Sequence, residues 1–93
     1  MKLTFKELVA CTGGHTTYTG EDFNISDIKF DSREDMKKSA FVAFVTNKDD
    51  GHKYVPVAAA KGAVVAIVSK DIDILIPTIQ VSDTKKAYQD IAK

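Results

Sequence analysis

The sequence predicts a small α/β domain in three layers, with a mixed sheet and one βαβ unit. Two runs, at 40–45 and 64–68, are apolar at successive positions, as in interior strands covered on both faces. The segment 53–61 between them has a helical pattern, and strand, helix and strand in this order form a βαβ unit. Ninety-three residues, of which 44% are hydrophobic and 28% charged, suit one domain spanning 1–93.

The N-terminal third is predicted to hold one helix and two short strands. Thr4 and Glu7 have the spacing of a capping box, and the apolar helical stripe that follows stops at Gly13-Gly14. Residues 16–19 are all β-branched or aromatic and favour a short strand. The isoleucines and the phenylalanine within 25–30 favour another.

The C-terminal half is predicted to alternate between helix and strand. Pro56 falls in the first turn of the central helix, where its missing N–H group is not needed, and Gly62 ends that helix. A strand is expected at 77–81, and one residue of the Ser82-Asp83 pair should cap a last helix at 84–92. The expected core consists of strand residues with three helical residues packed on them: Phe41, Val42, Phe44, Val65, Ile67, Ile79 and Val81, with Ala59, Ala60 and Tyr88.

Composition and charge exclude several classes of protein. Thirteen basic and thirteen acidic residues balance, whereas a nucleic-acid-binding surface has a clustered basic excess. No apolar run reaches the roughly 18–20 residues that span a bilayer, and no secretory signal heads the chain. Cys11 is the single cysteine, so we expect a cytoplasmic protein without nucleic acid or membrane as partner. It lies on the apolar stripe of the first helix and is expected in the core.

The sequence also lacks the motifs of nucleotide hydrolysis and metal chemistry. It has no G-x-x-x-x-G-K-[ST] loop and no G-x-G-x-x-G loop. His15 and His52 are far apart, and Cys11 has no C-x-x-C partner, so neither a metal site nor a resident cofactor is expected. The 93 residues alone are therefore predicted to catalyse no reaction.

An Asp-Ser-Arg triplet and an Asp-Gly-His triplet stand at the ends of predicted strands. Ser32 can donate or accept a hydrogen bond, and Asn47 can contact a base edge or a phosphate. Arg33 can bind a phosphate or pair with Asp31, which would fix the turn. His52 can face an anion at a helix start or satisfy a cap there.

Six short segments resemble, in order and spacing, the N-terminal, uridine-nucleotide-binding domain of the Mur ligases. They run along almost the whole chain: Thr-Gly-Gly at 12–14, Ile-Lys-Phe-Asp-Ser-Arg at 28–33, Phe-Val-Ala-Phe at 41–44, Asp-Gly-His at 50–52, Ala-Lys-Gly-Ala at 60–63 and Val-Ser-Asp-Thr at 81–84. Mur ligases are ATP-dependent enzymes that build the peptide stem of peptidoglycan. The resemblance thus implies a role in cell-wall synthesis, cell shape and cell division.

The resemblance also implies a binding site. The domain would bind the UDP part of a UDP-MurNAc-peptide through Ser32, Arg33, Thr46, Asn47 and His52. Its partners would be the remaining ligase domains, and ATP and Mg²⁺ are implied for that parent enzyme. One alternative is a standalone, non-catalytic nucleotide-binding module, and another is an interaction domain that has lost its ligand.

The chain departs from the family pattern at two positions. The family has glycine where Ser39 and Thr46 stand, and glycine suits a positive φ or the close approach of a ligand. Both departures therefore bear on the shape of the nucleotide loops. Within the family, the Thr-Gly-Gly segment and the acidic stretch at 71–73 favour the member that adds D-alanyl-D-alanine over the one that adds the third residue of the peptide.

Overall fold

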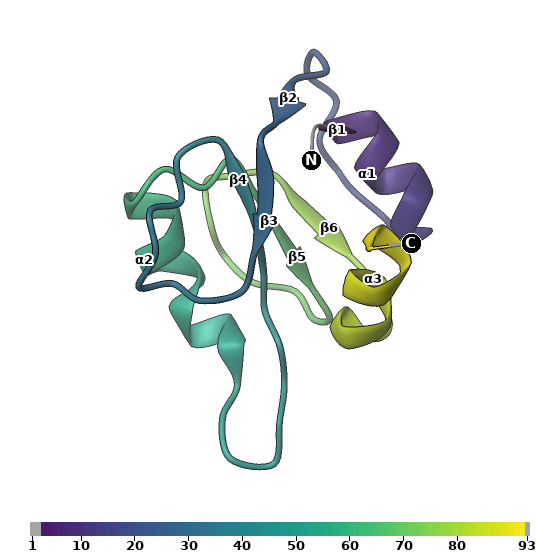
Figure 1. Ribbon diagram of the computed structural model, residues 1–93. Helices are drawn as coiled ribbons and strands as arrows, with labels where there is room; N and C mark the ends of the chain where they lie inside the picture. The colour runs from purple at the N-terminus through teal and green to yellow at the C-terminus, as the bar shows by residue number, and fades with distance from the viewer. Residues whose placement is uncertain (1–2, 93) are drawn as a thin grey trace.

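A four-stranded sheet lies at the centre of the protein, with helices on both of its faces (Figure 1). The structure is a computed structural model that describes residues 3–92; Met1, Lys2 and Lys93 lie outside the described residues. The sheet has the order β3-β4-β5-β6, and all three of its strand pairs are parallel. The strands are β3 (Asp27–Lys29), β4 (Ser39–Val42), β5 (Val65–Val68) and β6 (Thr78–Gln80).

Antiparallel pairing occurs at the margins of this parallel sheet. The two-residue strands β1 (Leu3–Thr4) and β2 (Asn24–Ile25) form an antiparallel ladder. His15 makes an antiparallel bridge to Gln80 beside the last strand. The α/β class and the mixture of parallel and antiparallel pairing are thus confirmed, and the predicted βαβ unit is the one formed by β4, α2 and β5.

Three connections join the parallel strands, and all three contribute to the core on one face. The connection from β4 to β5 contains a 3-10 helix, η1 (Gly51–Tyr54), and α2 (Val55–Ala60). The connections at 30–38 and 69–77 contain no helix. Instead they supply Met36 and a run of alternating isoleucines to the same side, which packs against α2 residues and Phe41. Apolar loop residues therefore substitute for the helices that parallel connections usually carry.

The opposite face is covered by α1 (Phe5–Thr12) and α3 (Thr84–Ile91), which lie side by side in Figure 1. Phe5 and Leu8 of α1 are buried against strand residues such as Val42 and Ile67. Because neighbouring residues of a strand point to opposite faces, Val42 belongs to this core and Phe41 to the other.

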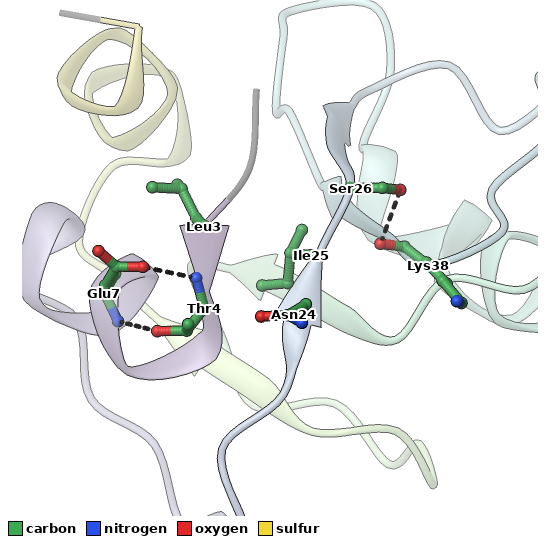
Figure 2. A pocket seen from close by; sticks show the side chains of 7 residues that line it. All are labelled: Leu3, Thr4, Glu7, Asn24, Ile25, Ser26 and Lys38. Atoms are coloured by element: carbon green, nitrogen blue, oxygen red, sulfur yellow. Dashed lines mark hydrogen bonds between the residues drawn. The ribbon is translucent and has the colours of Figure 1, made fainter.

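Local capping signals place the ends of these helices as predicted. The Thr4 hydroxyl accepts a hydrogen bond from the Glu7 N–H group, and the Glu7 carboxylate accepts one from the Thr4 N–H group (Figure 2). Gly13 ends α1 with a φ of 67°, in the left-handed region that glycine tolerates best. Asp83, rather than Ser82, caps α3 through the N–H groups of Lys85 and Lys86.

Several predicted elements are shorter than expected or absent. Residues 16–19 form no strand, because the Tyr18 N–H group bonds the Thr16 hydroxyl and the Tyr18 ring packs on Phe5 and Phe23. The strand expected within 25–30 is split into β2 and β3 at Ser26. The apolar run at 40–45 forms a strand only as far as Val42, and the first turn of the predicted central helix is 3-10.

Two predictions about burial are corrected. Cys11 is exposed and not in the core; its Sγ donates to the Asp90 carbonyl at 3.4 Å, between α1 and α3. Ala60 is exposed and Ala59 only half-buried, because α2 begins at Val55 and buries Val55 and Ala58 instead. The other predicted core residues divide into two groups: Phe41, Val42, Val65, Ile67 and Ile79 are buried, whereas Phe44, Val81 and Tyr88 are partly buried around them.

Candidate functional site

The predicted site residues lie near the carboxyl ends of neighbouring parallel strands. The strand β3 leads into the Arg33 loop, which we define as residues 30–38, and β4 leads into the His52 segment, residues 43–52. The strand β5 ends at Val68, and Ser69 and Lys70 follow it. Ligands of open α/β sheets bind at this edge, because loops from several strands converge there.

In the Arg33 loop, Asp31 and Arg33 form an ion pair. Arg33 Nη2 lies 2.8 Å from Asp31 Oδ2, and Nε of Arg33 also donates to this carboxylate. These hydrogen bonds lower the pKa of Asp31 to about 2, with the Arg33 N–H group adding to the effect. The Arg33 side chain remains 89% exposed, so the pair fixes the turn while leaving the guanidinium open to solvent.

Beside this loop is a cavity of about 410 Å³. It is lined by Phe30, Asp31, Ser32, Arg33 and Tyr54. Two of the five predicted contact residues, Ser32 and Arg33, therefore line the same cavity as Tyr54 of η1.

A second positive charge lies beside this loop. Lys61, at the end of α2, donates from Nζ to the Arg33 carbonyl oxygen at 3.1 Å. Its charge also contributes to the lowered pKa of Asp31. The loop and the end of α2 therefore bring together two cations and a hydroxyl group, a set that suits an anionic, hydroxylated ligand.

The two residues Thr46 and Asn47 occupy a different position. They lie on a turn that projects beyond the sheet in Figure 1, and they do not line the cavity. The Thr46 hydroxyl accepts the N–H groups of Lys48 and Asp49, and its own N–H group donates to the Asp49 carbonyl at 2.8 Å. Thr46 thus holds the turn together, while Asn47 lies exposed at its tip.

His52 is buried beneath this turn, with a side chain only 3% exposed. Its Nδ1 lies 2.6 Å from Asp50 Oδ1, and its Nε2 accepts the Ser69 N–H group at 3.0 Å. Because Nε2 accepts, the ring proton of the neutral imidazole resides on Nδ1 and is donated to Asp50. The ring therefore ties the segment after β4 to the end of β5, which is a positioning role.

Asp50 completes this network. Its second oxygen accepts from Lys70 Nζ at 2.6 Å, and its first also accepts the His52 N–H group at the start of η1. The hydrogen bond from Lys70, followed by those from His52, holds the pKa of Asp50 well below its usual range. Asp50 is thus the N-cap of η1.

Close backbone contacts explain why glycine stands in the middle of the Asp-Gly-His triplet. A Cβ atom at Gly51 would lie 2.7 Å from the Phe44 carbonyl oxygen and 2.8 Å from the Phe44 nitrogen. The Gly51 N–H group donates to that carbonyl at 2.6 Å. A side chain here would push the two backbones apart, so only glycine fits.

The structure also shows the backbone conformation at Ser39 and Thr46, the two positions where the family has glycine. Neither Ser39 nor Thr46 has a positive φ; among the described non-glycine residues, only Lys38 does, at 57°. Ser39 is a buried residue of β4 with 1% exposure. The positive φ of this turn therefore lies at Lys38, one position before Ser39.

Sequence reasoning missed three residues of this region: Tyr54, Lys61 and Lys70. Tyr54 lies two residues after the Asp-Gly-His triplet, and an aromatic residue in an exposed first helical turn was the available signal. The two lysines are brought to the site by α2 and β5, and no local pattern in the sequence indicates this.

A second cavity, of about 310 Å³, lies at the opposite, amino end of the sheet (Figure 2). Three of its polar side chains have partners within the chain: Thr4 and Glu7 cap α1, and the Ser26 hydroxyl donates to the Lys38 carbonyl at 3.2 Å. The side chains of Asn24 and Lys38 also line this cavity.

Two further surveys cover residues 3–92. No helix in this range is long and apolar enough to cross a membrane. Within the same range, no three His, Cys, Asp or Glu side chains form a group that could hold a metal ion.

Curated relatives of the chain are ligases with one shared name. The chain is 38% identical over 88 residues, 94% of its length, to the UDP-N-acetylmuramoyl-L-alanyl-D-glutamate–2,6-diaminopimelate ligase of Bacillus licheniformis. It is 36% identical over 92 residues to the ligase of this name from Listeria monocytogenes. The chain spans 18% of the length of each. No protein-family model matches the chain.

Solved structures give a related result. The chain superposes on MurF of Acinetobacter baumannii with a TM-score of 0.88 and 30% identity, covering 97% of this chain and 20% of that one. A second structure of this enzyme gives a TM-score of 0.89. Sequence and structure thus agree on the family while pointing to two different members. The chain is a homologue of the Mur ligases and has the fold of their N-terminal domain.

Proposed function

We propose that this domain binds the UDP part of a UDP-MurNAc-peptide at the carboxyl edge of its sheet. It would do so as the substrate-binding domain of an ATP-dependent Mur ligase that acts in peptidoglycan synthesis in the cytoplasm. Arg33 would contact the diphosphate, Ser32 and Asn47 would donate or accept hydrogen bonds, and Thr46 would shape the turn that carries Asn47.

One observation supports this proposal most directly: the cavity that contains Ser32 and Arg33. Arg33 leaves its guanidinium 89% exposed, and Lys61 lies at the carbonyl of this residue. A diphosphate carries negative charge that a guanidinium binds through charged hydrogen bonds. The homologues that the chain matches have names that begin with a UDP-N-acetylmuramoyl group, which is the same class of ligand.

His52 has a different role in this proposal from a direct ligand contact. Both ring nitrogens already have partners, Asp50 and the Ser69 N–H group. We therefore assign His52 to positioning the turn at 46–49, and not to the ligand.

ATP and Mg²⁺ belong to other domains of the proposed ligase. The carboxylates at this edge do not suit Mg²⁺, because Asp31 is paired with Arg33, Asp49 with Lys53 and Asp50 with Lys70. The remaining ligase domains are the proposed partners. A member that adds D-alanyl-D-alanine stays our prediction, because the structural neighbours are of that kind. The names of the curated relatives favour the other member, which adds diaminopimelate.

The alternative of a standalone, non-catalytic module makes a different prediction about the gene. A Gly-Thr-x-Gly-Lys-Thr/Ser loop within about twenty residues after Lys93 would establish the ligase, because that loop cradles the ATP phosphates. A stop codon at that point would favour the module.

Binding is tested by titrating the chain with UDP and with UDP-N-acetylmuramic acid. Ser32→Ala and Asn47→Ala should each weaken binding by several-fold to roughly a hundredfold, since a hydrogen bond contributes about 0.5–3 kcal/mol depending on the charge of its partner. Ser82→Ala, an exposed serine outside both loops, is the matched control and should bind normally. Equal affinity of all four proteins for UDP would remove Ser32 and Asn47 from the site.

A further inference from the structure

Phe30 is unusual among the aromatic residues of this chain. It is the last residue before Asp31, and 53% of its surface is exposed. Its ring nevertheless has a fixed environment: it lies 5.2 Å from the Phe44 ring and 5.7 Å from the Tyr88 ring, centroid to centroid. Phe44 and Tyr88 also contact each other edge to face at 5.5 Å.

This aromatic trio, defined as Phe30, Phe44 and Tyr88, holds one ring in place while leaving much of it in water. Burying apolar surface of a phenylalanine is favourable, and one side of the Phe30 ring is still exposed. A ligand that covers this side would therefore gain free energy of binding. The trio comes from three elements, namely the end of β3, the residues after β4, and α3. Such support keeps Phe30 in one orientation, which lowers the entropic cost of binding a flat ring to it.

The trio also stands where the two polar loops begin. Phe30 leads into the Arg33 loop and lines the cavity with Ser32 and Arg33. Phe44 leads into the turn that carries Asn47, and its backbone contacts Gly51. A flat ring placed on Phe30 would therefore share the cavity with the Ser32 hydroxyl group and the Arg33 guanidinium.

We propose that Phe30 is a stacking platform for the pyrimidine base of the bound nucleotide. This inference rests on the proposed function and adds a direction to it: the base lies at Phe30 and the diphosphate lies toward Arg33 and Lys61. Every nucleobase has a π face, so stacking contributes affinity, while a hydrogen bond from Ser32, which lines the same cavity, would help to select the base.

The test separates the base from the phosphates. UDP and pyrophosphate are titrated into wild-type chain and into Phe30→Leu, which keeps an apolar side chain but has no ring. Loss of the stacked ring should weaken UDP binding roughly 5- to 100-fold and leave pyrophosphate binding unchanged. Phe30→Trp, with a larger ring, should bind UDP at least as well as wild type. Leu75→Ala, which removes another exposed apolar side chain far along the sequence, should have no effect.

A spectroscopic signature distinguishes stacking from a structural effect. The H5 and H6 protons of uracil should move upfield when UDP binds wild type, because they lie over an aromatic ring, and this shift should vanish with Phe30→Leu. Melting curves of each variant check that the fold persists. If wild type binds UDP but Phe30→Leu binds it equally and with the same H5 and H6 shifts, stacking is wrong and the exposed ring serves contact with another domain. If wild type does not bind UDP, the proposed function fails and this inference fails with it.

Discussion

The Arg33 loop and the His52 segment are both short polar signatures at the same edge of the sheet, but they are held in opposite ways. The Arg33 loop is closed by an ion pair at the surface, with a guanidinium that is 89% exposed. The His52 segment is anchored by an imidazole that is 3% exposed and bonded at both nitrogens. One signature presents its polar groups outward, and the other uses them internally.

A polar motif at the end of a strand can therefore stabilise the local fold instead of binding a ligand. The buried imidazole and the backbone contact at Gly51 set the path of the chain after β4. The exposed loop then provides the groups that remain free for a ligand. Substitution of His52 should therefore act on stability, and substitution of Arg33 on binding.

The largest expected effect is the loss of the buried imidazole. His52→Ala leaves the Ser69 N–H group without its partner, removes the imidazole hydrogen bond to Asp50 and opens a cavity. It should therefore lower the free energy of unfolding by about 2–4 kcal/mol. Urea denaturation measures this. His15→Ala, the same substitution at an exposed histidine, is the control and should change the stability by less than about 0.5 kcal/mol. Equal losses for both histidines would contradict the anchoring role.

An intermediate effect is expected in the titration of the exposed pair. The pKa of Asp31 is about 2 in the folded chain against 3.8 for a free carboxyl. Its contribution to stability is therefore present above about pH 4 and is lost as the pH falls from about 4 to about 2. Arg33→Ala should return the midpoint toward 3.8, as followed by the carboxyl carbon shift of Asp31 in NMR.

The same variant sharpens the contrast with His52. Because the pair is exposed, Arg33→Ala should leave the melting temperature within about two degrees. UDP affinity should nevertheless fall roughly tenfold or more, since a charged hydrogen bond is lost. Lys53→Ala, which removes the partner of Asp49 instead, is the control and should leave the Asp31 midpoint in place. A large loss of stability in Arg33→Ala would place this loop in the same class as the His52 segment.

The smallest effect concerns the backbone at the end of the Arg33 loop. Lys38 has a φ of 57°, which costs an L-residue about 1–2 kcal/mol, whereas glycine adopts it freely but loses about 0.5–1 kcal/mol of chain entropy. Lys38→Gly should therefore stabilise the domain by up to about 1 kcal/mol. Ser39→Gly, one position later in buried β4, should destabilise it by about 0.5–1 kcal/mol. The opposite order in urea midpoints would show that Lys38 is unstrained.

Much of the fold could be predicted because its signals are local. The Thr4 cap, the Asp83 cap and the stop at Gly13 depend on residues within one turn, and each was confirmed. The interior strands could be predicted from their unbroken apolar runs, which only a sheet covered on both faces requires.

The wrong predictions concern residues whose conformation or burial depends on contacts with residues far away in the sequence. Residues 16–19 have strand propensity, but they form no strand. The Tyr18 ring packs against Phe5 and Phe23, and this packing sets the path of the backbone. His52 meets Ser69 seventeen positions away, and no pattern in the sequence foretells that an imidazole is buried there. Ser32 and Arg33 could be placed on a cavity from the sequence, whereas the contribution of Tyr54 and Lys61 required the packing of α2.

The central claim is that a uridine nucleotide binds at the carboxyl edge of this sheet. A titration of ¹⁵N-labelled chain with UDP, followed through the backbone amide shifts, tests it most directly. We predict shifts confined to residues 30–33 and 46–54, and none around the opposite cavity at 3–4, 24–26 and 38. Shifts centred on that opposite cavity, or no shifts at UDP concentrations on the order of millimolar, would contradict it.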